Sequence, residues 1–428
     1  MSAFPPNHPQ RLTLADEVHA RPPQPLATPA RASYLALLVD AEARDSELRH
    51  LATLCKRHDL PPPAADATHL RAQIGAVTLK WERHGEFSGY TISASGLPEA
   101  PFAQTALALL PKGWLEGIPG RTVAAVHAEV SAPPMAALDA ETLALRFAGH
   151  GVVGSSIAEG AARLYTDFRI HDDGCSRLWL INERLTEAQT GRILQRLFEI
   201  EAYRVLALLA LPIARRQGPR IMAIEGALSQ LTDNMAREGG DDEALLHELM
   251  RMAAEVESGI AASQFRFGAC EAYHGLVRRR IAELREARLP GLQTVDEFMS
   301  RRLDPAAATC ANTAARLKGL ADRIGQTSAL LATRVGIARE HQNQRLLASM
   351  DRRAKLQLRL QQTVEGLSVA AVAYYVAGLV GYLAKAAKAV GLNLNPDIAV
   401  GVVVPVTAAV MLWSLRRMRR RLSDDEPG

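Results

Sequence analysis

Two uncharged stretches near the C-terminus decide the architecture of the chain. The first, GLSVAAVAYYVAGLVGYLA, runs from Gly366 to Ala384, and the second, IAVGVVVPVTAAVMLWSL, runs from Ile398 to Leu415. A helix rises about 1.5 Å per residue, so each stretch is long enough to cross a hydrocarbon layer about 30 Å thick. A pair of buried core helices is the alternative. We expect a two-span transmembrane hairpin over residues 364–415, with the lipid bilayer as its surroundings.

Basic residues flank the outer ends of both stretches. Those before the first stretch are Arg352, Arg353, Lys355 and Arg359, and those after the second are Arg416, Arg417, Arg419, Arg420 and Arg421. The connecting loop holds only Lys385, Lys388 and Asp397. Because short cytoplasmic segments carry an excess of Lys and Arg, both chain termini should face the cytoplasm, and residues 416–428 should form a basic cytoplasmic tail.

The composition is typical of a folded protein. The 428 residues are 48% hydrophobic and 22% charged, which suits roughly two or three domains. The net charge is +4, but residues 351–428 hold eleven Lys and Arg against six Asp and Glu, which leaves 39 basic and 40 acidic residues in the rest. The positive excess therefore accompanies the membrane segments, and we expect no nucleic-acid partner.

The cysteines do not form a metal-binding pattern. They are Cys55, Cys175, Cys270 and Cys310. No Cys-x-x-Cys pair occurs, and His58 near Cys55 lacks a second ligand pair, so no zinc site is completed. We expect reduced thiols in the cytoplasm. Residues 1–25 contain proline and charge where a secretory signal needs an apolar run, so no cleaved signal is expected.

Small residues recur at four-residue spacing in the first span. They are Ala373, Ala377 and Gly381. Such a stripe lets another helix approach closely, and that helix is either the second span or a span of another subunit. Tyr374 and Tyr375 would need a polar lumen or a hydrogen bond within the hairpin, whereas Tyr382 suits an interfacial aromatic belt. Pro405 should kink the second span.

A long helix is predicted before the membrane. Asp304 followed by Pro305 is a helix-start signature, and no further proline occurs until Pro396. Apolar residues recur at intervals of three and four at Leu317, Leu320, Ile324, Leu331, Val335, Leu346, Met350, Leu360 and Val364. This pattern predicts a stalk helix over residues 305–363. Its apolar stripe must pack on upstream helices or on copies of itself, which predicts a coiled coil and a homo-oligomer.

The rest of the chain predicts an α+β fold class. Residues 1–185 are predicted to form an N-terminal α/β cytoplasmic domain, with a helix near 43–58 between strand-like runs at 33–39, 74–81, 89–93, 123–130, 162–170 and 176–181. Residues 186–304 are predicted to form a helical bundle, with helices near 187–215, 219–237, 242–262 and 264–288. Ser263 is expected to separate the last two.

Several short motifs resemble parts of catalytic or binding sites. Gly149 to Gly154 matches the dinucleotide pattern G-x-G-x-x-G, but a helix precedes it, so a connecting loop is favoured. His247-Glu248 begins like a zincin helix, but Arg251 stands where the second metal ligand should be. The zincin motif is therefore incomplete, whereas a nucleotide-dependent enzyme that uses the Gly149 to Gly154 loop remains a third hypothesis.

Two other polar stretches have both a functional and a structural interpretation. His171-Asp172-Asp173-Gly174 offers three potential ligands for a divalent ion, but it is also a turn signature between two strands. Trp81 to Phe87 (WERHGEF) would form a site only if other groups converge on it, and charges at a strand edge are the alternative. We find no Ser-His-Asp, Cys-His or P-loop arrangement, so we expect neither an enzyme nor a cofactor.

Five stretches resemble a bacterial family known as the domain of unknown function 3422, described as predicted membrane-anchored proteins. They are Asp16 to Pro22 (DEVHARP), Trp81 to Phe87, Gly191 to Pro212, Glu340 to Met350 (EHQNQRLLASM) and Gln361 to Tyr375. The resemblance covers nearly the whole chain and implies the bacterial cytoplasmic (inner) membrane as the location. It implies no activity.

A weaker, topological similarity is to CorA-type magnesium channels. These are homopentamers in which a long helix leads into the first of two C-terminal spans. That family ends its first span with Tyr-Gly-Met-Asn, whereas the loop here reads Val390-Gly391-Leu392-Asn393. The resemblance implies a divalent cation held by Asn393 and the Gly391 carbonyl at a pore mouth. A helix C-cap is the alternative for the same residues.

Together these patterns predict a membrane-anchored, oligomeric structural or regulatory protein with a large cytoplasmic domain. A CorA-like divalent cation channel or transporter is the alternative. The candidate membrane or pore residues are Tyr374, Tyr375, Gly378, Gly381, Asn393 and Pro405.

Overall fold

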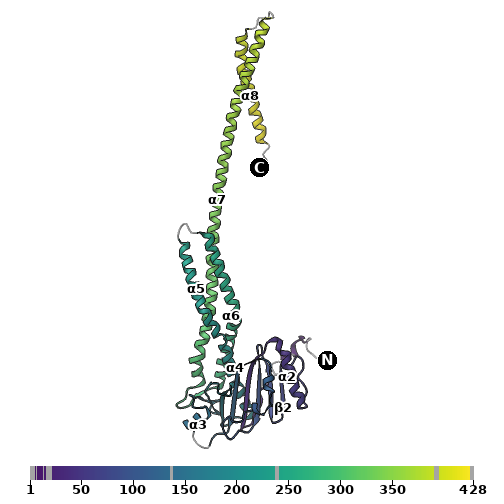
Figure 1. Ribbon diagram of the computed structural model, residues 1–428, viewed down its shortest axis with the longest axis vertical. Helices are drawn as coiled ribbons and strands as arrows, with labels where there is room; N and C mark the ends of the chain where they lie inside the picture. Colours follow the sequence, from purple (N-terminus) through teal and green to yellow (C-terminus); the bar gives the residue numbers. More distant parts are fainter. Residues whose placement is uncertain are drawn as a thin grey trace. The chain divides into compact units, whose positions relative to one another are not determined.

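The computed structural model of the protein describes residues 5, 7–12, 14–15, 22–134, 138–236, 241–389 and 395–424. The chain divides into two compact units, Met1–Ser328 and Ala329–Gly428, which are described separately. Figure 1 labels helices α2 to α8 and strand β2. The fold class is α+β, as predicted.

A nine-stranded sheet forms the base of the first unit, in the order β2-β3-β4-β1-β5-β8-β7-β6-β9. Its strands are β1 (Ala30–Leu38), β2 (His69–Ile74), β3 (Val77–Arg83), β4 (Phe87–Ser95), β5 (Arg121–Ser131), β6 (Val153–Ile157), β7 (Ala162–Thr166), β8 (Ser176–Asn182) and β9 (Ala287–Arg288). Neighbouring strands are antiparallel except β5 and β8, which are parallel. Two antiparallel groups of strands are thus joined by one parallel pair.

Short helices lie between the strands in the first part of the chain, and long helices follow strand β8. They are α2 (Arg44–Arg57), α3 (Ala140–Arg146), α4 (Glu187–Leu208), α5 (Leu211–Met235), α6 (Asp242–Leu284), α7 (Val295–Ala389) and α8 (Pro396–Asp424), with short 3-10 helices at Ala41–Ala43, Leu107–Leu109 and Leu115–Gly117. The first part of α7 belongs to the first unit and the rest to the second. Figure 1 shows α4, α5 and α6 gathered beside that first part of α7.

Helices cover both faces of the sheet because apolar side chains alternate along its strands. On one face, Leu37 of β1 and Trp81 of β3 join a buried cluster with Leu51 of α2. On the other face, the ring of Tyr34 stacks on Phe198 of α4, with ring centroids 5.1 Å apart. Successive residues of a strand point to opposite faces, so a single strand contributes to both cores.

The start of α4 shows how closely the chain segments pack. Thr186 and Gln189 form a capping box, in which each side chain bonds to the backbone N–H of the other residue. One residue after Thr190, a Cβ atom on Gly191 would lie 1.8 Å from the backbone oxygen of Gln24. Only glycine allows the N-terminal segment to approach α4 this closely.

Several predicted helix boundaries are wrong. The break predicted after residue 215 lies at residues 209–210, between the end of α4 and the start of α5, and the helix predicted to reach residue 288 ends at Leu284. The predicted break at Ser263 does not occur, because the Ser263 hydroxyl donates to the carbonyl of Gly259 within the same helix, and α6 continues. The predicted start at Asp304-Pro305 is also wrong. The helix begins at Val295, capped by reciprocal hydrogen bonds between Thr294 and Glu297, so Pro305 lies inside it.

Candidate functional site

The second unit contains the predicted small-residue stripe, which faces α8. Ala373 is buried, Ala377 is half-buried, and a Cβ atom on Gly381 would lie 3.2 Å from a methyl group of Val400 in α8. The second span is therefore the helix that approaches the stripe. The end of α7 and α8 form a closely packed helix pair.

Tyr374, Tyr375 and Gly378 lie away from this contact. The side chains of Tyr374 and Tyr375 are 77% and 74% exposed, so they do not lie between the two helices. Gly378 has no neighbour within 4 Å of a built Cβ atom, and Pro405 lies inside α8. Asn393, the candidate cation ligand, lies outside the described residues.

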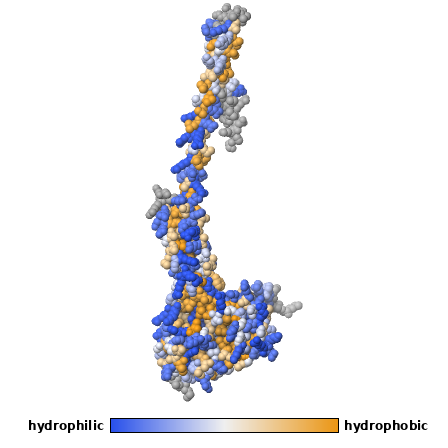
Figure 2. Space-filling model, in the orientation of Figure 1, coloured by the Kyte–Doolittle hydropathy of each residue, from blue (hydrophilic) through white to orange (hydrophobic). Residues whose placement is uncertain are grey.

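Within the part of the chain that the structure describes, two helices, Val295–Ala387 and Asp397–Ser414, contain a stretch long and apolar enough to cross a membrane. The buried share of the apolar stretch is 6% in the first and 0% in the second. A core helix of a soluble protein would be mostly buried, so this exposure argues against the core-helix alternative. Figure 2 shows hydrophobic side chains on the surface of these helices.

A separate cluster of polar side chains lies in the first unit, beside the sheet. Asp167 follows directly after β7, and His171 lies in the turn between β7 and β8. His150 comes from the loop between α3 and β6. The turn is tight, since the Gly174 N–H donates to the His171 carbonyl at 2.8 Å. The prediction of a turn at residues 171–174 is confirmed. The same turn also places the His171 side chain next to Asp167.

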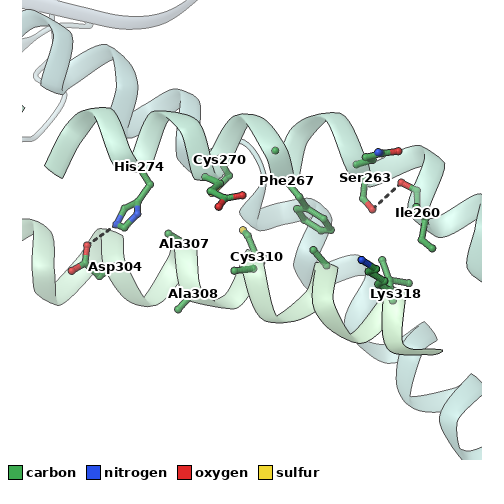
Figure 3. A pocket seen from close by; sticks show the side chains of 16 residues that line it. Ile260, Ser263, Phe267, Cys270, His274, Asp304, Ala307, Ala308, Cys310 and Lys318 are labelled. Atoms are coloured by element: carbon green, nitrogen blue, oxygen red, sulfur yellow. Dashed lines mark hydrogen bonds and ion pairs between the residues drawn. The ribbon is translucent and has the colours of Figure 1, made fainter. Parts of the chain in front are cut away.

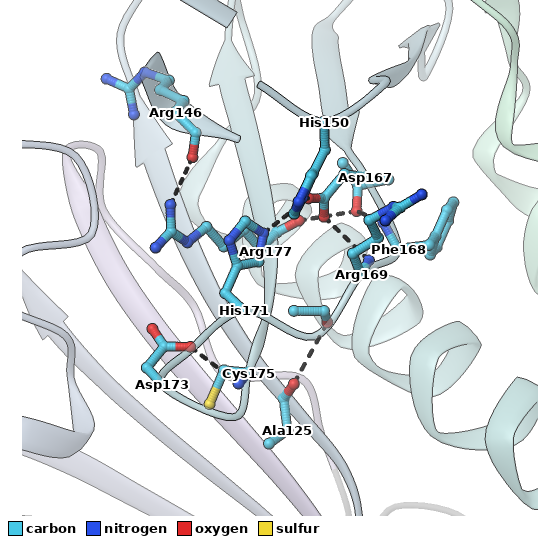
Figure 4. A network of polar contacts seen from close by, with 12 residues as sticks. Ala125, Arg146, His150, Asp167, Phe168, Arg169, His171, Asp173, Cys175 and Arg177 are labelled. Atoms are coloured by element: carbon cyan, nitrogen blue, oxygen red, sulfur yellow. Dashed lines mark hydrogen bonds and ion pairs between the residues drawn. The ribbon is translucent and has the colours of Figure 1, made fainter. Parts of the chain in front are cut away.

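The carboxylate of Asp167 is the centre of this cluster. Its Oδ2 accepts from His150 Nδ1 and from His171 Nε2, each at 2.8 Å. Its Oδ1 accepts from the backbone N–H of Arg169 at 3.2 Å. The exposed fraction is 0% for the Asp167 side chain, 4% for His171 and 30% for His150. Figure 4 shows both imidazoles turned toward the carboxylate.

A second group of three polar side chains lies on the other side of the same turn. His127 Nδ1 shares a hydrogen bond of 2.8 Å with Ser33 Oγ, while its Nε2 lies 3.9 Å from Asp173 Oδ2. Burial lowers the pKa of His127 to about 4 despite the nearby carboxylate. Burial also raises the pKa of the Cys175 thiol to about 12. At neutral pH these groups are an uncharged imidazole and an uncharged thiol.

The comparison with protein families identifies the chain. The profile of a family described as "Protein of unknown function (DUF3422)" matches residues 6–422. The chain belongs to the DUF3422 family. This confirms the resemblance drawn from the five stretches, and the family description assigns no activity.

Other comparisons add no argument about the fold or the activity of this DUF3422 protein. No match was found among curated proteins. The structure of the full-length CmaX protein is similar at 15% sequence identity, covering 70% of this chain and 94% of that chain. The TM-score is 0.20, which is too low to establish a common fold.

One stretch that carries the family resemblance, Trp81 to Phe87, has a structural role. Glu47 of α2 is fully buried, and its carboxylate accepts from Trp81 Nε1 at 3.0 Å, Ser88 Oγ at 3.1 Å and Tyr90 Oη at 2.7 Å. Arg83 lies 3.6 Å from the same carboxylate. The groups that converge on the stretch therefore hold α2 on the sheet.

The two weaker motifs have the structural interpretation that the sequence favoured. Gly149 lies in the turn after α3, and Val153 begins β6, so no strand–loop–helix surrounds the glycine-rich segment. Arg251 pairs with Glu248 at 2.6 Å on the surface of α6. The segment contributes a metal-type ligand all the same, because His150 lies within it.

A groove of about 640 Å³ runs between α6 and the first part of α7. Phe267, Cys270 and Cys310 lie along it, and His274 bonds to Asp304 at 2.8 Å at one end (Figure 3). Burial raises the pKa of Cys270 to about 12, and the adjacent Cys310 adds to this shift. A groove lined in this way suits an apolar ligand.

The motifs in the sequence include His150 and His171 in separate segments, and none of them includes Asp167. His150 belongs to the glycine-rich segment and His171 to the predicted turn. The available signal was the spacing of Asp167 and His171, which are four residues apart and follow a strand. Nothing in the spacing indicates that the distant loop of His150 reaches the same point.

Proposed function

We propose that this protein is a membrane-anchored homo-oligomer with a structural or regulatory role. In this proposal the first unit, called the sheet domain below because it contains the nine-stranded sheet, and the basic tail lie on the cytoplasmic side of the bacterial inner membrane. The observation that carries the proposal is an apolar seam on α7 that lacks cover. Every residue from 336 to 364 is exposed, although apolar side chains recur there at helical spacing.

The seam continues a face of α7 that is covered further upstream. Leu317, Leu320 and Ile324 are 3%, 2% and 1% exposed in the first unit. At about 100° per residue, Leu346 and Leu360 fall on that same face of the helix. Their exposed fractions are 55% and 68%. The same apolar stripe therefore continues from covered into uncovered helix.

Copies of this chain are the occupant that best suits the seam. In two copies of the chain, each anchored by its own membrane hairpin, the α7 helices run parallel and present identical seams in register. This is the arrangement of a parallel coiled coil. Arg353 and Gln357 fall within the seam by the same spacing, and polar seam positions select register and oligomer number. The oligomer therefore needs no other partner to cover the stripe.

Two double variants test the seam against a matched control. Leu346→Glu with Leu360→Glu puts charge on the seam, whereas Leu347→Glu with Leu358→Glu puts it on another side of the helix. The control residues are equally exposed, at 65% and 61%. We expect the seam variant to lower the mass of the detergent-solubilised protein, measured by light scattering, while the control keeps it. A monomeric wild type, or equal masses for both variants, would contradict the proposal.

The membrane orientation is tested separately. The basic residues on the outer flanks of both spans and the sparsely charged loop support cytoplasmic termini. A reporter that is active only in the cytoplasm should therefore work when fused after Gly428. A reporter active only outside should work when inserted in the loop at residues 390–394. The reverse pattern would overturn the orientation without affecting the oligomer.

The CorA-like channel remains the alternative from the sequence. It depended on a cation ligand at Asn393, which lies outside the described residues, and on Tyr374 and Tyr375, whose rings are exposed on the helix pair. A ring of about five subunits in the light-scattering experiment, together with divalent-ion flux in proteoliposomes that Asn393→Ala abolishes, would favour the channel.

A further inference from the structure

We propose that His150, Asp167 and His171 bind a divalent transition-metal ion of the zinc class, with one coordination position left open to water. The proposal concerns the first unit and does not depend on the oligomer. The donor atoms are His150 Nδ1, His171 Nε2 and an Asp167 carboxylate oxygen, and they all lie within 4.8 Å of one another. Two imidazoles and one carboxylate form a ligand set that suits zinc, and also iron, nickel or copper.

The distances fit an ion after a small rearrangement. Each histidine nitrogen now lies 2.8 Å from Asp167 Oδ2, which is a hydrogen-bond distance. Zinc binds imidazole nitrogen and carboxylate oxygen at about 2.0–2.2 Å, so two tetrahedral ligands lie about 3.3–3.5 Å apart. The donors therefore need to separate by roughly half an ångström. A neutral imidazole can bind through the nitrogen facing the ion while its other nitrogen carries the proton.

The charge of the cluster favours a cation at its centre. The Asp167 side chain is fully buried, and a buried carboxylate is costly unless a positive group compensates it. Its ion-pair partners among the described residues are His150 and His171. Imidazole supplies a full positive charge only when it is protonated, whereas a divalent ion supplies it in any case. An ion in place of the two N–H protons would therefore satisfy the carboxylate.

The surrounding backbone holds the ligands in place. The Asp167 carboxylate also accepts from the Arg169 N–H, and the His171 N–H donates to the Cys175 carbonyl at 2.9 Å. Phe168 has a positive φ of 52°, and its ring stacks on Phe298 of α7. These contacts are the kind of outer support that orients metal ligands. His150 is the most exposed of the three ligands, so the open position faces its side.

The neighbouring group of His127, Asp173 and Cys175 is a poorer site. Its Nδ1 bond to Ser33 leaves His127 only Nε2 for an ion, and Asp173 is 38% exposed. This group is the competing location for any ion that binds near the turn.

The experiment measures zinc binding by the full-length protein in detergent, in competition with a chromogenic chelator. We expect one zinc ion per chain and at least about a 10-fold loss of affinity in His150→Gln and in Asp167→Asn, since even outer-shell changes cost 10–100-fold. His247→Gln, at an exposed histidine on α6, is the matched control and should bind like the wild type. Circular dichroism checks the fold, and His150→Gln decides if Asp167→Asn does not fold.

Cobalt(II) substitution locates the ion independently. Binding at the proposed site should give visible ligand-field bands without a thiolate-to-cobalt charge-transfer band, and Cys175→Ser should leave the spectrum unchanged. A charge-transfer band that Cys175→Ser removes would place the ion at the competing group and overturn the proposal. Failure to bind zinc, or wild-type affinity in His150→Gln, would overturn it as well.

Discussion

The sheet domain and the exposed length of α7 use apolar and polar side chains in opposite ways. In the sheet domain, Leu51 is fully covered, and the buried carboxylate of Glu47 accepts three hydrogen bonds. On α7, Leu346 and Leu360 lie in solvent, and the polar residues around them are exposed too. The first region buries Leu51 and pairs the Glu47 carboxylate within one chain, whereas the second leaves the apolar side chains of its seam exposed.

The largest effect is expected at Glu47. Glu47→Ala removes the acceptor for Trp81, Ser88 and Tyr90 and leaves their polar groups buried without a partner. Breaking a buried charged network in this way costs about 3–5 kcal/mol, so the denaturation midpoint of the sheet domain should fall sharply. Glu42→Ala, at an exposed residue just before α2, is the control and should change the unfolding free energy little. Equal effects would show that the network is not needed.

A pH-dependent effect of intermediate size is expected from His127. The pKa of His127 is lowered to about 4 in the folded protein, mainly by burial and slightly by Arg177, against an ordinary value of 6.5. Between pH 6.5 and 4, His127 is protonated in the unfolded chain and neutral in the folded chain. The stability contributed by neutral His127 is therefore present above pH 6.5 and is lost as the pH falls toward 4. The loss is at most about 3 kcal/mol.

The measurement for His127 is the unfolding free energy at several pH values between 4 and 7. His127→Gln should flatten the pH dependence relative to the wild type in this window. His247→Gln, at an exposed histidine, should keep the wild-type slope. If His127→Gln keeps the same slope as well, other groups cause the pH dependence.

The smallest effect is expected on the exposed length of α7. Leu358→Ala removes a side chain that is 61% exposed and lies away from the seam, so the unfolding free energy should change by less than about 0.5 kcal/mol. The same substitution at the buried Leu51 should cost about 2–5 kcal/mol. Thermal unfolding of both variants makes the comparison. A large effect at Leu358 would mean that this side of α7 is also covered.

The sequence was sufficient wherever one local pattern decided the structure. The uncharged stretches ending at Ala384 and Leu415 correspond to helices that pair through Gly381 and Val400. The alternating runs around Tyr34 and Trp81 are strands of the sheet. In these segments the periodicity of apolar residues is stronger than any competing signal.

The sequence was insufficient where a side chain had two local options. Ser263 could end a helix or bond back to its own helix, and it bonds to Gly259. Asp304-Pro305 could start a helix or lie within one, and the cap at Thr294 decides. Such choices depend on neighbouring elements that no short window contains.

The candidate metal cluster could not be predicted from short stretches of sequence, because its ligands come from separate loops. His150 and Asp167 are separated by β6 and β7, and they meet because the two strands form a hairpin. The pairing register of that hairpin, Val153 opposite Thr166, brings the two loops to the same end of the strands. A ligand set of this kind becomes visible only after the strands are paired.

The position of strand β9 late in the chain affects when the sheet can be completed during synthesis. Ala287 and Arg288 pair with Ser156 and Ser155 at the edge of the sheet, although two strands and three helices (β7, β8, α4, α5 and α6) lie between them in the chain. A ribosome adding about 5–20 residues per second completes β6 on the order of ten seconds before it reaches β9. During that time the outer side of β6 is an open strand edge, which other chains can join. The nascent chain therefore passes through a stage in which this edge of its sheet is open, and pairing with the two residues of β9 ends that stage.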